Sequence, residues 1–142
     1  MDTALRSKSE ENTKLANLAI QETYYAASIH CSYYACLQLM GHIQRSDFGM
    51  TDEDVENEQK EIKGDSHNLL INKFIGKLRY SSQIPNNQRV NIEELFTTNM
   101  RMLRTKRKKA DYENKKIGRF EANESLRISN EIIEILTKYF TV

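Results

Sequence analysis

Apolar side chains recur at spacings of three and four residues along nearly the whole chain, which is the period of an α-helix. No segment shows the alternation of apolar and polar residues that a half-buried strand requires. Tight turns between strands need glycine and proline, and the 142 residues include only five glycines and one proline. These features predict an all-α fold, with a single domain over residues 1–142 built as an up-down bundle of four or five antiparallel helices.

The most apolar stretch, residues 24–43, predicts the central helix of the bundle. Its main stripe consists of Tyr25, Ile29, Ser32, Cys36, Met40 and Ile43, flanked by Ala26, Tyr33 and Leu37. A helix that is apolar over so wide an arc has to be covered on several sides. Within one helix, Cys31 and Cys36 face directions about 140° apart, so they cannot form a disulfide with each other.

Four other segments predict helices with one buried face each. Residues 11–20 form a short amphipathic helix with Leu15, Leu18 and Ala19 on one side. A helix from about Ser66 buries Leu70, Phe74 and Leu78, and a turn around Pro85 follows it. Asn91 with Glu94 predicts the start of a long helix that ends at Gly118 and buries Ile92, Phe96, Met100 or Asn99, Leu103 and Ala110. The last helix, from about residue 121 to 140, buries Ala122, Leu126, Ser129, Ile133, Leu136 and Phe140.

Residues 45–66 are acidic and separate the central helix from the next one. Residues 52–61 alone hold six carboxylates, namely Asp52, Glu53, Asp54, Glu56, Glu58 and Glu61. Thr51 and Asp54 could cap a short helix in this segment, and a mobile acidic loop is an equal alternative.

Over the whole chain the charges nearly cancel, with 21 Lys and Arg against 20 Asp and Glu, so only a local patch could bind a polyanion. Residues 101–119 form such a patch, with nine cations and two anions. The candidate nucleic-acid-binding residues are Arg101, Arg104, Lys106, Arg107, Lys108 and Lys109. Phosphate recognition requires a cluster of this kind, although a solvated helix face is the simpler interpretation.

Arg107 lies on the helix stripe that otherwise faces the core, between Leu103 and Ala110. A buried guanidinium needs a partner or a water-filled groove. Asp111, four residues later, is the nearest candidate partner, and Tyr112 adds a hydroxyl beside it. Arg107, Asp111 and Tyr112 are therefore the candidate catalytic residues, and the alternative is that Arg107 and Asp111 only tie this helix to a neighbour.

Three short motifs occur in the order in which they appear in a family of small prokaryotic HEPN-domain proteins: YYA at 33–35, SH at 66–67 and RKKADY at 107–112. The chain resembles this family over roughly residues 10–140. The resemblance implies an up-down helical bundle that forms a homodimer, with the arginine helices lining a cleft between subunits. It also implies a role with RNA or a nucleotide in a toxin–antitoxin or defence module, or beside a small nucleotidyltransferase.

In the ribonuclease members of that family, four to six residues separate the arginine from a following histidine, and this chain lacks that histidine. Tyr112, Glu113 and Asn114 occupy those positions, and no histidine follows His67. The prediction is therefore binding of RNA or a nucleotide without the usual nuclease centre. One alternative is a metal-free endoribonuclease toxin that uses Arg107, Asp111 and Tyr112, with His67 approaching from another helix. The other is a non-catalytic module that partners a nucleotidyltransferase or an antitoxin.

The remaining motifs predict no cofactor and no metal site. The three histidines and two cysteines lack the spacing of metal ligands, and no glycine-rich phosphate loop occurs. The simpler interpretation of His67 is a local hydrogen bond at a helix start. The pairs Tyr24–Tyr25 and Tyr33–Tyr34 could stack on bases, but their helix favours core packing. With neither a secretory signal nor a membrane span, the expected location is cytoplasmic.

Overall fold

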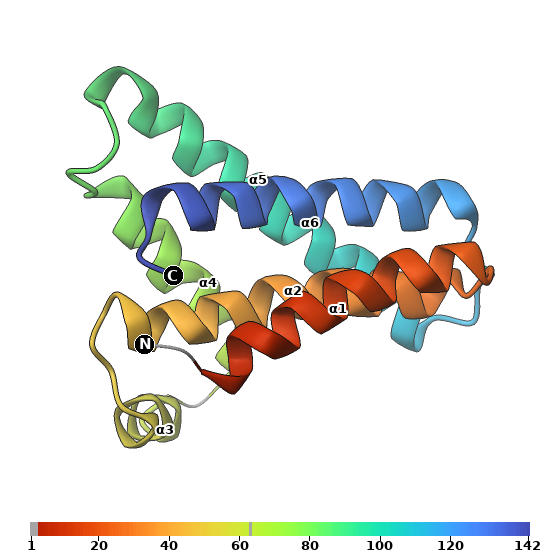
Figure 1. The fold of residues 1–142 in the computed structure, drawn as a ribbon, viewed down its shortest axis with the longest axis horizontal. Helices are drawn as coiled ribbons and strands as arrows, with labels where there is room; N and C mark the ends of the chain where they lie inside the picture. Colours follow the sequence, from red (N-terminus) through yellow and green to blue (C-terminus); the bar gives the residue numbers. More distant parts are fainter. Residues whose placement is uncertain (1–2, 63) are drawn as a thin grey trace.

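The computed structural model describes residues 3–62 and 64–142, which form six α-helices and no β-strand (Figure 1). The helices are α1 (Ala4–Gln21), α2 (Tyr25–Ser46), α3 (Asp52–Lys60), α4 (Ser66–Arg79), α5 (Asn86–Tyr112) and α6 (Arg119–Tyr139). This confirms the predicted all-α class. The helices number six rather than four or five because the acidic segment adds a short helix. Within the described ranges, no helix is both long and apolar enough to cross a membrane.

α2 is the central helix, as predicted, and it packs against α1, α4, α5 and α6. In Figure 1, α1 and α5 run antiparallel to α2, whereas α6 runs parallel to it. Ile29, Cys36, Met40 and Ile43 of α2 are each at most 1% exposed. The main core joins side chains of α2 to those of α4, α5 and α6, and both cysteines are free.

The prediction for the first helix was wrong in its extent and in its buried face. α1 begins at Ala4, and its buried residues are Ser9, Ala16 and Ile20. Leu15 and Leu18 are 50% and 53% exposed. α1 lies so close to α2 that small residues fill the contact, and the Ser28 hydroxyl of α2 donates to the Ala16 carbonyl at 2.8 Å. The larger leucines are therefore excluded from this contact.

This arrangement predicts that Leu15→Ala changes the free energy of unfolding by less than about 1 kcal/mol, because the leucine loses little buried surface. Ala16→Leu should instead destabilise the protein by about 1–3 kcal/mol, because the added atoms have no space against α2. Urea unfolding of the two variants checks both values. A large loss for Leu15→Ala would contradict the assignment of the buried face.

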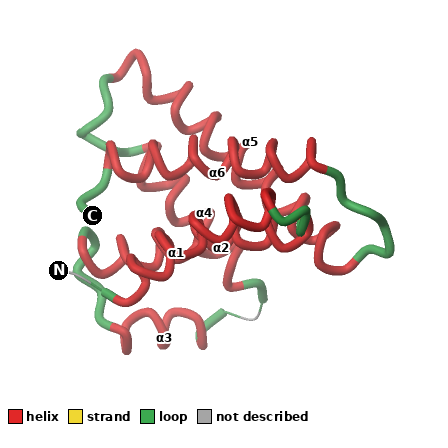
Figure 2. Tube along the Cα trace, turned by 45° about the vertical axis from the view of Figure 1, so that its right-hand side comes forward, coloured by secondary structure: helices red, strands yellow, loops and turns green. Residues whose placement is uncertain are grey.

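The acidic segment contains the short helix α3, so the capped-helix alternative is confirmed. The Thr51 hydroxyl accepts from the Asp54 N–H, and the Asp54 carboxylate accepts from the Thr51 N–H at 2.8 Å. These bonds lower the pKa of Asp54. α3 buries none of its own residues and lies apart from the other helices in Figure 2. Ion pairs from Lys73 to Glu58 (2.5 Å) and from Arg45 to Asp52 (2.8 Å) hold it against the bundle.

Both predicted ends of the long basic helix were wrong. α5 begins at Asn86, directly after Pro85, so the Asn91 and Glu94 pattern lies inside the helix. Proline fixes the backbone before a first turn, which explains the earlier start. α5 ends at Tyr112, and Gly118 instead precedes α6, where its N–H donates to the Glu121 carboxylate at 3.1 Å.

The buried faces of the later helices match the predicted stripes in part. Phe74 and Leu78 of α4, Phe96, Met100 and Leu103 of α5, and Ala122, Ser129 and Leu136 of α6 are buried. Leu70, Ile92, Ala110, Leu126, Ile133 and Phe140 are only partly buried. On α6, the centre of the buried face holds Ile128 and Ile132 instead. α6 packs against both α2 and α5, so its apolar face is wider than one stripe.

Candidate nucleic-acid interface

Arg107 points into the protein, as its position on the helix predicts, and the residue is 5% exposed. Its guanidinium carbon lies 4.9 Å from the centre of the Tyr33 ring and 5.7 Å from that of Tyr34, both on α2. The ring of Tyr112, the last residue of α5, lies 5.8 Å away. Aromatic faces stabilise a desolvated guanidinium without neutralising its charge.

The polar contacts of Arg107 leave part of its hydrogen-bonding capacity unused. Its Nη1 donates to the Tyr112 hydroxyl at 3.4 Å and lies 3.6 Å from Oδ2 of Asp111. Charge-assisted hydrogen bonds of this kind are usually about 2.7–2.9 Å long, so both contacts are weak. Within the described part of the chain, the buried Nε atom has no hydrogen-bond partner. The structure therefore brings the three candidate catalytic residues together around an incompletely bonded guanidinium.

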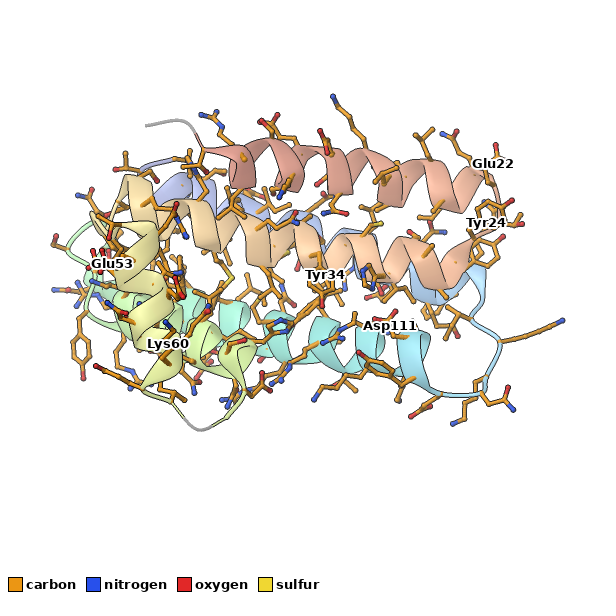
Figure 3. The ribbon with its side chains drawn as sticks, turned by 90° about the horizontal axis from the view of Figure 1, so that it is seen from below. Glu22, Tyr24, Tyr34, Glu53, Lys60 and Asp111 are labelled. Atoms are coloured by element: carbon orange, nitrogen blue, oxygen red, sulfur yellow. The ribbon has the colours of Figure 1, made fainter. Side chains whose placement is uncertain are left out.

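Asp111 makes its shorter contact with a histidine from another helix. Nδ1 of His30, on α2, lies 2.9 Å from Asp111 Oδ2, and the Asp111 side chain is only 19% exposed. The His30 ring in turn lies 4.6 Å from the Tyr34 ring. Figure 3 shows Tyr34 and Asp111 between α2 and α5. Asp111 thus ties α5 to α2 and also orients an imidazole beside Arg107.

His67, at the start of α4, approaches the same group of side chains. Its Nδ1 lies 3.1 Å from the Tyr33 hydroxyl, and its ring lies 5.9 Å from the Tyr34 ring, edge to face. Burial, followed by the charges of Arg107 and Lys108, lowers the pKa of His67 from its usual value of about 6.5. The neutral form of the His67 imidazole is therefore favoured over the imidazolium.

Tyr33 is fully buried and packs the core with its hydroxyl at the edge, as the core interpretation predicts. Burial raises its pKa, which keeps the phenol neutral. Tyr24, in contrast, is 65% exposed and only precedes α2, so it does not pack the core. The side chains that meet here form the Arg107 cluster, which consists of Tyr33, Tyr34, His30, His67, Arg107, Asp111 and Tyr112.

The other five basic candidates do not form one continuous free surface. Arg101, Lys108 and Lys109 are exposed, and no ion pair engages them within the described ranges. Arg104 is half-buried and forms an ion pair with Asp65. The Asp65 carboxylate also accepts the His67 and Asn68 N–H groups, which caps α4. Lys106 is half-buried on the opposite flank of α5, near Glu124.

His30 is a member of this site that the sequence pattern does not reveal. It lies 81 residues before Asp111, and neither residue has a neighbour in sequence that points to the other. The only available signal was the helical period, which places His30 four residues before Tyr34. The approach of His67 toward Arg107 from another helix agrees with the alternative drawn from the sequence, since both side chains contact the Tyr33 ring.

Neither cysteine is a reactive thiolate. Burial, and then the negative charge of Asp111, raises the pKa of Cys31, and burial raises that of Cys36 to about 12. In the described ranges, no three His, Cys, Asp or Glu side chains gather closely enough to hold a metal ion. The proton-transfer groups near Arg107 are therefore the two imidazoles, with the Asp111 carboxylate and the Tyr112 phenol beside them.

The chain matches no family model, and neither the curated proteins nor the solved structures include a significant match to it. The assignment of a function to the interface therefore rests on the side chains described above.

Proposed function

We propose that the protein binds RNA or a nucleotide through the C-terminal half of α5. The single observation that carries the proposal is a buried guanidinium with unused hydrogen-bonding capacity, Arg107, beside exposed cations of the same helix. A phosphate at the edge of the cluster supplies acceptor oxygens for the Nη atoms of Arg107, whose contacts with Tyr112 and Asp111 are long, and Arg101 and Lys108 can neutralise its charge. Tyr112, 76% exposed, adds an aromatic face for a base.

The motifs that resemble the HEPN family support this proposal because all three supply members of the Arg107 cluster. Tyr33 and Tyr34 come from the first motif, His67 from the second, and Arg107 and Asp111 from the third. On this basis we propose an HEPN-like bundle that acts as a homodimer within a toxin–antitoxin or defence module in the cytoplasm.

Salt titration of RNA binding, with two variants of opposite expected effect, tests the proposal. Lys108→Ala should reduce the slope of log affinity against log salt by about 0.7, because one phosphate contact is lost. Asp65→Asn should raise the affinity about three- to tenfold at low salt, because it frees Arg104 from a competing carboxylate. Asparagine caps a helix as well as aspartate does, so α4 is preserved.

Glu53→Gln is the matched control for Asp65→Asn, because it removes the same charge from the same acidic segment. Glu53 lies at the opposite end of the molecule from Asp111 in Figure 3. Glu53→Gln should therefore change the affinity for RNA less than twofold. If the wild-type protein shows no salt-sensitive affinity for any RNA or nucleotide, the proposed function is wrong.

A second candidate function, metal-free RNA cleavage, is favoured by one observation: His30 and His67 flank the same Tyr34 ring beside Arg107. Cleavage needs a base for the ribose hydroxyl, an acid for the leaving oxygen and a cation for the phosphorane. The Arg107 cluster contains all three kinds of group, although the imidazoles come from α2 and α4 rather than from α5.

In this reaction the ribose 2′-oxygen attacks phosphorus, which forms the P–O2′ bond and breaks the P–O5′ bond. His67, in the tautomer whose Nδ1–H donates to Tyr33, accepts the hydroxyl proton at Nε2. His30, doubly protonated with Nδ1 bound to Asp111, donates its Nε2 proton to the departing 5′-oxygen. The products are a 2′,3′-cyclic phosphate and a 5′-hydroxyl.

A further inference from the structure

A second basic site lies on the other flank of α5, away from the contact with α4. Four lysines, Lys106, Lys109, Lys115 and Lys116, line a hollow of about 230 Å³ between the end of α5, the 113–118 connection and the start of α6. Ile29 and Ile117 provide apolar surface within it. These residues form the lysine hollow.

The lysine hollow keeps a positive balance after its own carboxylates are accounted for. Glu113 lies 3.5 Å from Lys115 as an ion pair, and Glu121 accepts the Gly118 N–H. Across the described part of the chain, no carboxylate lies within ion-pair distance of the other three lysines, Lys106, Lys109 and Lys116. The N-terminus of α6 adds the positive end of its dipole. The site is thus built to receive negative charge that the fold does not itself supply.

The helical period places Tyr112 between the two basic flanks of α5. At about 100° per residue, Tyr112 lies about 40° from Lys108 on one side and about 60° from Lys109 on the other. Lys108 borders the Arg107 cluster, since its charge acts on His67, and Lys109 lines the lysine hollow. The exposed Tyr112 ring therefore occupies the crossing between the two sites.

We infer that the lysine hollow holds phosphates of the same RNA strand that binds at the Arg107 cluster, and that this strand crosses α5 over Tyr112. The inference rests on the proposed function and extends it to single-stranded RNA. A base can stack on Tyr112 only if it is unpaired, and a flexible single strand can follow the curvature of the helix.

The test compares ligands that fill one site or both. The probes are a uridine dinucleotide and an oligouridylate of about 12 nucleotides, a length within the usual range of single-strand binding sites. In the double variant Lys109→Gln/Lys116→Gln, the affinity for the longer probe should fall about tenfold and its salt slope by about 1.4, as for two lost phosphate contacts. The affinity for the dinucleotide should change less than twofold.

The matched control is Lys8→Gln/Lys14→Gln, which removes the same charge from exposed positions of α1 and should leave both probes within twofold. Equal losses for the short and long probes, or no loss beyond the control, would overturn the inference while leaving the proposed function in place. Preferential loss of binding to a poly-glutamate peptide would also overturn it, in favour of an acidic protein partner. If wild-type protein binds neither RNA probe, the proposed function fails and the inference fails with it.

Discussion

Replacing Arg107 by alanine is expected to lower the affinity for RNA by about 10- to 100-fold, because a hydrogen bond to a charged group contributes about 1.5–3 kcal/mol. Arg107→Lys should retain part of the affinity, since lysine keeps the charge and loses the planar donor group that fits a phosphate. Fluorescence anisotropy with a labelled single-stranded RNA measures both.

Arg127→Ala is the control for Arg107→Ala, because Arg127 is an exposed arginine of α6 paired with Glu124 and Glu131. It should leave the affinity within twofold. Thermal unfolding of each variant separates a loss of binding from a loss of fold, since Arg107 also packs on Tyr33. A folded Arg107→Ala variant with undiminished affinity would show that the guanidinium serves only the packing of α5 on α2.

If the protein cleaves RNA, His67→Gln should reduce the cleavage rate by about 10²- to 10⁴-fold, the usual contribution of a positioned proton-transfer group. The glutamine amide can still bond to the Tyr33 hydroxyl, so the contact between α4 and α2 is kept. Because the pKa of His67 is lowered, its neutral form should dominate down to pH values below about 6.5. As the pH is raised, the cleavage rate should therefore increase with the fraction of neutral His67 and reach its plateau below about pH 6.5.

His30→Gln provides the complementary measurement. It should remove the proposed acid, while the rise of the cleavage rate with pH that His67 causes should remain. Cleavage products with 2′,3′-cyclic phosphates identify the reaction. Cleavage that remains in a preparation of Arg107→Ala measures the activity of any contaminating nuclease. Fragments that persist unchanged in the His30→Gln/His67→Gln double variant would eliminate the cleavage candidate. The binding proposal would still stand in that case.

The class of fold and the place of α2 could be predicted because both follow from the local period of apolar residues. Ile29, Met40 and Ile43 share a face whatever packs on it, so their burial was predictable. The face of α1 was not, because Ala16 and Ser9 are buried through close contact with α2, and a pattern of large apolar residues points to Leu15 and Leu18 instead. The predicted end of the long basic helix was wrong because a glycine such as Gly118 can follow one helix or precede the next.

The candidate site also has some features that local sequence predicts and others that depend on how the helices pack. The inward direction of Arg107 follows from its spacing to Leu103, and the structure confirms it. The pairing of His30 with Asp111 depends on how α2 and α5 pack, which no local pattern contains. The ion pair of Arg104 with Asp65 likewise depends on where α4 begins relative to α5.

The Arg107 cluster is assembled from α2, α4 and α5, and α4 is anchored chiefly on α5, with few contacts to α2. A sub-global opening in which α4 alone detaches would carry His67 and Asp65 away and leave the cations of α5 in place. Under mild denaturant, this protein would then pass through a species that retains polyanion affinity after its proton-transfer chemistry is gone. Amide hydrogen exchange along α4 would report that species before the global transition.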